Sequence, residues 1–275
     1  MNLAKPQGGS GRSSGVERVV DILELLRKIG APIPVGQLAA RLNAPRSTVY
    51  HLINTLSAAG LLTINQAGEV FFDIAVYFYA SSYARQHPVI ALGAEEVTRI
   101  GRATGETAEL CALIKNRYAI VHSMPGNSLL RLDTAPGLML PVPWTASGRL
   151  LVAHMSMEEV LALVPPEDFN LPNGTVLTAQ AFYDEVRCAD AQGLCITSGI
   201  LDSFTQCIAV PIRSTSGQNI ATLCFVVPVG IEKAREEELI AVLRESQRRL
   251  SQYPIAFMTG RPASLSASSP KRGDQ

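Results

Sequence analysis

The stretch PVGQLAARLNAPRSTVYHLINTLSAAGLL, residues 34–62, decides the fold of the first part of the chain. It contains two runs whose apolar residues recur with the spacing of one helix face, and these are Val35, Leu38, Ala39 and Leu42, then Val49, Leu52, Ile53 and Leu56. Asn43 interrupts the pattern, and Pro45 suits the first turn of a new helix because its missing N–H would be unpaired there. Gly60 is a typical helix stop. The stretch therefore predicts two helices joined by a tight turn.

The flanking residues complete a small domain. Upstream, residues 16–29 carry a third amphipathic stripe, with Ser14 and Glu17 spaced as a capping box and Gly30 as a stop. Downstream, the runs LLTI (61–64) and EVFF (69–72) flank a turn-forming segment. The order helix, helix, turn, helix, β-hairpin predicts a winged helix-turn-helix domain over residues 14–73, with the helix-turn-helix at about 35–54.

The face of the third helix that points away from its apolar stripe is suited to DNA. It carries hydrogen-bonding side chains and no acid, and a helix of this width fits the major groove. Arg46 stands at the helix start, where it reaches either a guanine edge or a phosphate. A winged helix that binds protein is the alternative. The residues expected to lie nearest the DNA are Arg46, Ser47, Thr48, Tyr50, His51 and Asn54.

The charge distribution favours the same function weakly. The 275 residues have a formal net charge of +0. Residues 1–87 contain eight Lys or Arg and five Asp or Glu, whereas the remainder has an equal excess of acids. A basic module that meets a polyanion gives this asymmetry.

The rest of the chain predicts an α+β fold. Residues 74–90 indicate a linker helix, unusually rich in apolar and aromatic residues, that we expect to pair two chains. Residues 91–253 alternate strand-like and helix-like runs, which predicts a second domain with a central antiparallel sheet. The segments 1–13 and 254–275 are low in apolar residues and are expected to be disordered tails.

Several function classes are disfavoured. No apolar run is long enough to cross a membrane, and the first fourteen residues lack an apolar signal core, so we expect a cytoplasmic protein without membrane contact. The five cysteines form no CxxC and no ligand spacing with the four histidines, so neither metal nor cofactor is expected. No nucleophile elbow, phosphate loop or dinucleotide motif is present, and Cys207 has no basic neighbour in sequence, so we expect no enzyme. A ligand-sensing interaction module that does not bind DNA is the remaining alternative.

The chain resembles IclR-type transcriptional regulators over about residues 14–252. The resemblance is carried by SSGVERVVDILELL and the stretch 34–62, then by IGRATGETAEL, APGLMLPVPWTASGRLLVA and TQCIAVPIRSTSGQNIATLCFVV. It implies a GAF/PAS-like second domain that binds a small effector. It also implies a homodimer or dimer of dimers on a double-stranded, palindromic DNA operator, acting as repressor or activator of a catabolic operon.

The resemblance also implies an effector pocket, which carries over by position. Thr197-Ser198-Gly199 stands where small-acid-binding members have an acidic stretch, and Pro143-Trp144-Thr145 replaces a His-Ala-Thr run. These departures disfavour a glyoxylate-like ligand. An apolar wall with few neutral polar groups and free N–H groups at a helix start favours a small carboxylate with a modest apolar part. The implied pocket residues are Leu129, Leu132, Leu140, Ala146, Ser147, Thr197, Thr205 and Cys207.

Overall fold

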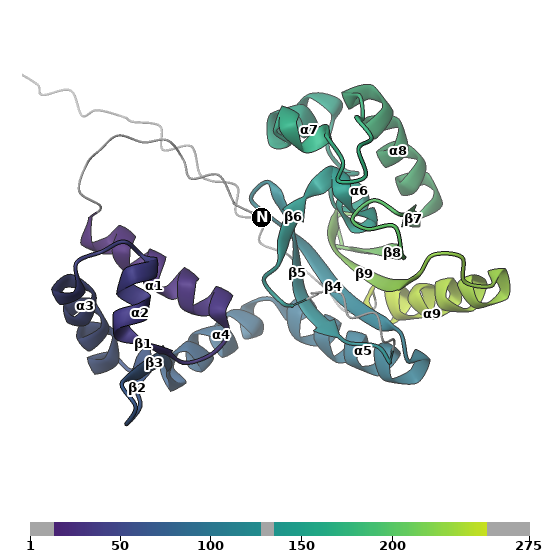
Figure 1. The fold of residues 1–275 in the computed structure, drawn as a ribbon. Coiled ribbons are helices and arrows are strands. Elements are labelled where there is room, and N and C mark those ends of the chain that lie inside the picture. The colour runs from purple at the N-terminus through teal and green to yellow at the C-terminus, as the bar shows by residue number, and fades with distance from the viewer. Residues whose placement is uncertain (1–13, 128–134, 252–275) are drawn as a thin grey trace, which may run out of the picture. The chain divides into compact units, whose positions relative to one another are not determined.

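The computed structural model describes residues 14–127 and 135–251 and divides into two compact units, Met1–Tyr83 and Ala84–Gln275 (Figure 1). Leu129 and Leu132 of the expected pocket, and the two expected tails, lie outside the described residues. Within the described ranges, no helix combines the length and the apolar character that a membrane span requires.

The first unit is a winged helix. Its elements are α1 (Gly15–Ile29), β1 (Ile33–Pro34), α2 (Val35–Arg41), α3 (Arg46–Ala58), β2 (Leu62–Ile64) and β3 (Glu69–Phe72). The three strands form an antiparallel sheet in the order β1-β3-β2. The core is formed by the buried stripes of the three helices, with Ile22, Val49 and Ile53 fully or almost fully buried.

Local sequence signals set the boundaries of these helices. Ser14 caps α1, and its side chain and that of Glu17 form the reciprocal capping box. Gly30 ends α1 in the left-handed region at φ 66°, where a side chain is disfavoured. Asn43 adopts φ 48° in the turn between α2 and α3, a conformation that asparagine tolerates better than most residues. Pro45 occupies the N-cap position of α3 rather than its first turn.

The helical region after the wing consists of two helices. α4 (Ile74–Gln86) ends before His87, and α5 (Pro88–Thr104) begins at the proline. A residue before proline disfavours the helical region, which explains the break. The linker helix expected to reach residue 90 therefore ends at Gln86, and α5 packs on the sheet of the second unit.

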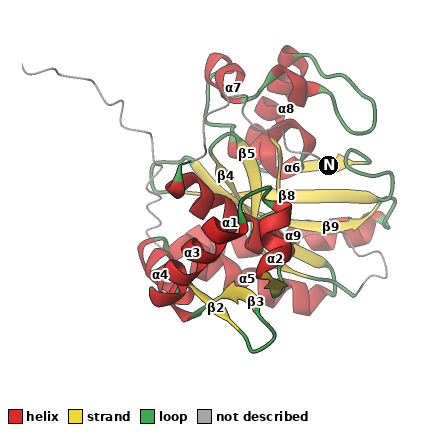
Figure 2. Ribbon diagram, turned by 60° about the vertical axis from the view of Figure 1, so that its left-hand side comes forward, coloured by secondary structure: helices red, strands yellow, loops and turns green. Residues whose placement is uncertain are grey.

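The second unit is built on a six-stranded antiparallel sheet in the order β6-β5-β4-β9-β8-β7. The strands are β4 (Thr107–Ile114), β5 (Arg117–Met124), β6 (Met139–Pro141), β7 (Cys195–Ser198), β8 (Thr205–Arg213) and β9 (Asn219–Pro228). α5 and α9 (Lys233–Ser251) cover one face, where the largest apolar cluster lies (Figure 2). Gly93 and Gly101 let α5 approach closely, because a Cβ at either position would stand within 3 Å of Leu110 or Met124.

The opposite face carries the remaining helices. These are the 3-10 turn η1 (Val142–Trp144), α6 (Ala146–Leu151), α7 (Met157–Leu163), the 3-10 turn η2 (Pro166–Phe169) and α8 (Ala179–Gln192). α6 contacts β8 and β9 directly. Arg149 holds α6 in place, since its buried guanidinium donates to the carbonyl oxygens of Pro143 and Thr145 and pairs with Glu185. This sheet face carries the second set of candidate site residues.

Candidate nucleic-acid interface and effector-facing sheet

α3 presents one polar face to solvent. Val49, Ile53 and Leu56 are buried against α1 and α2, so the residues between them point outward. Of the six residues expected near DNA, Thr48 is half-buried and the others are exposed, namely Arg46, Ser47, Tyr50, His51 and Asn54. The structure thus places all six on or beside one accessible helix face.

The charge around this face suits a polyanion. Residues 33–68, which cover α2, α3 and most of the wing, contain no Asp or Glu. Arg41 and Arg46 are the exposed cations of that segment. A face without acids avoids repulsion from phosphates, and its amide, imidazole and hydroxyl groups match base edges.

Hydrogen bonds of the Asn65 side chain stabilise the turn of the wing hairpin. The Asn65 side-chain oxygen accepts from the backbone N–H groups of Ala67 and Glu69, and its amide donates to the Glu69 carboxylate. β2 and β3 pair in register from Leu62 with Phe72 to Ile64 with Val70. The hairpin is therefore a defined element beside α3.

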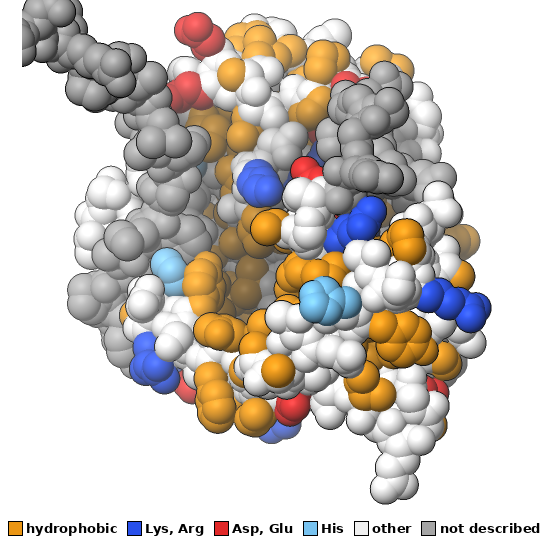
Figure 3. All heavy atoms as spheres, turned by 90° about the vertical axis from the view of Figure 1, so that its left-hand side faces the viewer, with side chains coloured by type: hydrophobic (Ala, Val, Ile, Leu, Met, Phe, Trp, Pro, Cys, Tyr) orange, Lys and Arg blue, Asp and Glu red, His pale blue; other side chains and the backbone are white. Residues whose placement is uncertain are grey.

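α4 exposes an aromatic surface in the isolated chain. None of its residues is buried, and Tyr77, Phe78 and Tyr79 are each 60% or more exposed. Tyr77 and Phe78 stack edge to face. Figure 3 shows apolar side chains, drawn in orange, at the surface of one face of the molecule. Apolar patches of this kind mark interaction surfaces.

In the second unit, the described residues of the expected effector pocket lie on the sheet face that α6 covers or in α6 itself. Leu140, Ala146 and Cys207 lie in one apolar cluster. Thr197 is the register partner of Cys207 across β7 and β8. Thr205 precedes Cys207 by two residues on the same strand and so faces the same side, where its hydroxyl donates to Asp202.

Ser147, in the first turn of α6, is buried, and its hydroxyl has no partner among the described residues. A buried hydroxyl without a partner costs stability, so it is a candidate for a ligand contact. The first N–H groups of a helix also lack intrahelical acceptors. In contrast, Trp144, the last residue of η1, donates its indole N–H to the carbonyl oxygen of Asp168 in η2 at 2.8 Å.

Two features of this region disfavour a catalytic cysteine. Burial raises the pKa of the Cys207 thiol well above its usual range. Burial likewise raises the pKa of Cys195 to about 11. A nucleophilic cysteine needs the opposite shift, so these shifts disfavour either thiol as a nucleophile.

A group on the same face was missed by the sequence analysis. Glu109 is fully buried, and burial raises the pKa of its carboxyl to about 7, opposed by hydrogen bonds from Tyr118, Cys224 and Cys111. Treating the cysteines separately as small apolar residues hid this group. The alternation of AELCALI, which puts Glu109 and Cys111 on one face of a buried strand, was the available signal.

An open pocket of about 350 Å³ lies at the edge of the sheet, between β7 and α8. Of the six expected effector residues that the structure describes, it contains only Thr197. Its charged pair, Arg149 and Glu185, is already satisfied internally. The open pocket therefore does not coincide with the expected effector site.

Comparison with known proteins agrees with this architecture. The family model described as "IclR helix-turn-helix domain" matches residues 15–65, and "Bacterial transcriptional regulator IclR C-terminal" matches residues 81–252. The HTH-type transcriptional regulator KdgR of Escherichia coli is 24% identical over 241 residues, which cover 86% of this chain and 92% of that protein. The HTH-type transcriptional repressor AllR of E. coli is 24% identical over 162 residues, covering 58% of this chain and 59% of that protein.

Solved structures show the same fold. An IclR homologue from Microbacterium hydrocarbonoxydans, complexed with 4-hydroxybenzoate, superposes with a TM-score of 0.74 at 23% identity, covering 87% of this chain and 98% of that one. The IclR regulator of Alicyclobacillus acidocaldarius gives 0.72 at 18% identity, covering 87% and 98%. The two family models together span both units of the structure. The chain therefore belongs to the IclR family of bacterial transcriptional regulators.

Proposed function

We propose that this regulator binds a palindromic operator with α3 of two chains and controls a neighbouring catabolic operon in response to a small carboxylate. The observation that carries the DNA-binding part is the exposed, acid-free face of α3. Asn54 and His51 offer hydrogen-bonding groups for base edges, and Arg46 supplies positive charge at the helix start.

Two chains are needed because one winged helix contacts too few bases to define a unique genomic site. The aromatic surface of α4 supports a homodimer, since no residue of this helix is buried in the part of the chain that the structure describes. Symmetric pairing of two α4 helices would bury Tyr77, Phe78 and Tyr79 and relate two copies of α3 by a two-fold axis. A dimer of dimers extends the same assembly.

The proposed effector site is the sheet face under α6. Leu140 and Cys207 supply an apolar wall, while Ser147 supplies a buried hydroxyl that lacks a partner. The N–H groups of Ala146 and Ser147 favour a negatively charged oxygen. The Microbacterium relative was solved with 4-hydroxybenzoate, a carboxylate with an apolar ring. A sugar would need many more hydrogen-bonding partners than this face offers.

The protein acts by binding and not by turnover. Burial raises the pKa of the Cys195 and Cys207 thiols, which is the opposite of the shift that an activated nucleophile needs. Effector binding is instead expected to shift the populations of two dimer geometries, which match or miss the half-site spacing of the operator.

One titration tests the proposal. Fluorescence anisotropy with labelled DNA from upstream of the gene measures operator affinity, with and without a panel of aromatic and short-chain organic acids. We expect specific, salt-dependent binding that one acid changes about 5- to 150-fold. Binding of an acid with no binding of any DNA would favour the interaction-module alternative.

A thermal-shift screen tests the effector class separately. A ligand at 100 times its Kd adds about 2.7 kcal/mol to stability, which raises the melting midpoint measurably. If only sugars or neutral amines raise the midpoint, the effector is not a carboxylate.

A further inference from the structure

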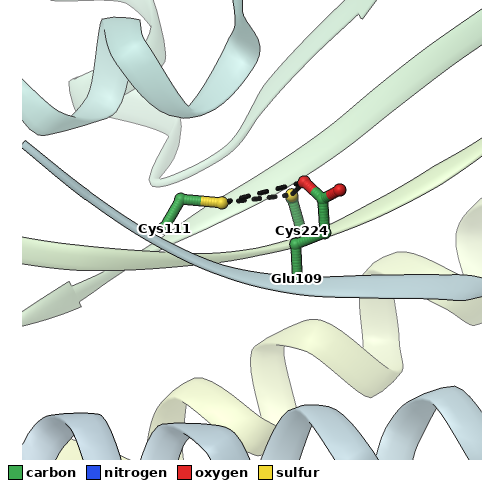
Figure 4. A group of neighbouring side chains, drawn as sticks. All are labelled: Glu109, Cys111 and Cys224. Carbon is green, nitrogen blue, oxygen red and sulfur yellow. Dashed lines mark hydrogen bonds between the residues drawn. The ribbon is translucent and has the colours of Figure 1, made fainter. Parts of the chain in front are cut away.

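Two cysteines and a glutamate converge in the interior of the second unit. Figure 4 shows the sulfurs of Cys111 and Cys224 and the carboxylate of Glu109 pointing toward one another. Glu109 and Cys111 come from β4, and Cys224 lies directly opposite Glu109 on β9. All three residues are buried. Ladder hydrogen bonds between two central strands therefore fix their positions.

The separations between the three groups are those of a metal site. The sulfurs are 3.9 Å apart, and Glu109 Oε2 lies 3.5 Å from Cys224 Sγ and 3.8 Å from Cys111 Sγ. In a tetrahedral zinc site with Zn–S of about 2.3 Å and Zn–O of about 2.0–2.2 Å, two sulfurs stand about 3.8 Å apart and a sulfur and an oxygen about 3.5–3.6 Å apart. To bind zinc, the three distances between the two sulfurs and the carboxylate oxygen would have to change by only a few tenths of an ångström.

The hydrogen bonding of this cluster is incomplete. Glu109 Oε1 has no partner among the described residues, and neither has the hydroxyl of Thr222, which lies opposite Cys111. No ion pair of the described residues involves Glu109. A fully buried carboxyl is usually paired or coordinates a metal. Packing alone leaves these two polar atoms unexplained.

A fourth oxygen stands beside the triangle. The Tyr118 hydroxyl donates to Glu109 Oε2 at 3.1 Å and lies 3.0 Å from Cys111 Sγ. It is placed to orient the carboxylate or to approach the fourth position of a tetrahedral ion. The donor set is thus two sulfurs and one or two oxygens.

We propose that Glu109, Cys111 and Cys224 form a binding site for one thiophilic divalent cation, Zn²⁺, in the sheet of the second unit. Thiolate sulfur selects Zn²⁺ over Mg²⁺ or Ca²⁺, which prefer oxygen. On binding, the two thiols and the carboxyl release their protons to solvent, and the divalent ion offsets two of the three resulting negative charges. The sequence spacing hid the site because 113 residues separate the two cysteines.

The site is tested with full-length protein, freed of metal with a chelator under reducing conditions and then titrated. Co²⁺ serves as the optical probe, because Co²⁺ bound to thiolates absorbs strongly in the near ultraviolet, and Zn²⁺ is added as competitor and measured by calorimetry. We expect one ion per chain, a thiolate–Co²⁺ band and its loss when Zn²⁺ displaces Co²⁺. A wild-type protein without this band overturns the proposal, as does mass spectrometry that finds Cys111 and Cys224 joined in a disulfide under these conditions.

Variants locate the ion. Tyr118→Phe should weaken binding about 10- to 100-fold, as loss of a positioning partner does. Cys111→Ser and Cys224→Ser should weaken it further and remove the band, and Glu109→Gln provides a ligand change that spares both sulfurs. Cys195→Ser and Cys188→Ser are matched controls, one buried and one exposed, outside the triangle. Circular dichroism identifies any variant that fails to fold. A band of unchanged intensity in folded Cys111→Ser or Cys224→Ser protein, or an unchanged Co²⁺ affinity of folded Glu109→Gln protein, places the ion elsewhere and overturns the proposal.

Discussion

The guanidinium of Arg46 lies over Gly36, across the turn that joins α2 and α3. A Cβ on Gly36 would stand 4.0 Å from the Arg46 Cζ atom. The side chain therefore extends toward the start of α2, where a DNA backbone would pass if α3 lay in the major groove. This position favours a phosphate contact over a base contact for Arg46.

Replacing Arg46 tests this contact. Arg46→Ala should weaken binding to all DNA sequences by a similar factor, and the slope of log K against log salt should shrink by about 1. The measurement is anisotropy with operator variants at several salt concentrations. Arg244→Ala removes an exposed charge from the second unit and should change neither quantity. Relaxed specificity at a single base pair would instead assign Arg46 to a base.

Asn54 is the clearest candidate for reading a base. Its amide is exposed on the outward face of α3 and matches the paired donor and acceptor of adenine. Asn54→Ala should cost about 1–3 kcal/mol on the operator and relax specificity at one position. Thr55→Ala is the neighbouring control, because the Thr55 hydroxyl already donates to the His51 carbonyl oxygen at 3.0 Å. Equal effects of the two substitutions would contradict the assignment.

The winged helix could be predicted closely from sequence because its determinants are local. Ser14 with Glu17, Gly30 and the stripe of Val49, Ile53 and Leu56 each act within one or two helical turns, and the structure has all of them where the spacing puts them. The linker helix was expected to reach residue 90 but ends at Gln86, before Pro88. Two details differ: Pro45 is the N-cap of α3 and not a residue of its first turn, and the short strand β1, which pairs with β3, was not predicted.

The second unit shows where such reasoning fails. The contacts of Glu109 with Cys224 depend on which strands become neighbours, and β4 pairs with β9 across more than a hundred residues. A pattern of period two places a side chain on a face but does not state which strand lies beside it. The group is therefore invisible until the strand order is known.

The α4 surface leads to a prediction about assembly. Phe78 is 60% exposed in the isolated chain and should become buried in the dimer. Phe78→Glu would bury a carboxylate without a partner, at a cost of several kcal/mol, and should weaken the dimer about 100-fold or more. Sedimentation over a range of concentrations measures this. Val176→Glu, at an exposed apolar position in the second unit, is the control. A variant that stays dimeric at low concentration would exclude α4 as the interface.

Substitution of Ser147 distinguishes a role in ligand binding from a role in folding. Since its buried hydroxyl has no partner among the described residues, Ser147→Ala should leave the unliganded protein as stable as before, or more stable by up to about 1 kcal/mol. The same change should reduce the thermal shift caused by the effector. Thr145→Ala is the contrasting variant, because the Thr145 side chain caps α6 through the Gly148 N–H at 2.9 Å and its loss should lower stability directly. If Ser147→Ala destabilises the protein and leaves the effector-induced shift intact, the hydroxyl does not contact the effector.

We expect effector binding in the second unit to be coupled to operator binding by the first unit. If the effector selects one dimer geometry, operator DNA must change effector affinity by the same factor by which the effector changes operator affinity. A coupling of about 1–3 kcal/mol makes that factor about 5 to 150. Calorimetric titration of the effector into free protein and into the protein–operator complex measures one side, and anisotropy with and without effector measures the other. Phe78→Glu should abolish the coupling while keeping effector binding, because a monomer has no dimer geometry to select. Equal effector affinity with and without operator would show that the two units act independently.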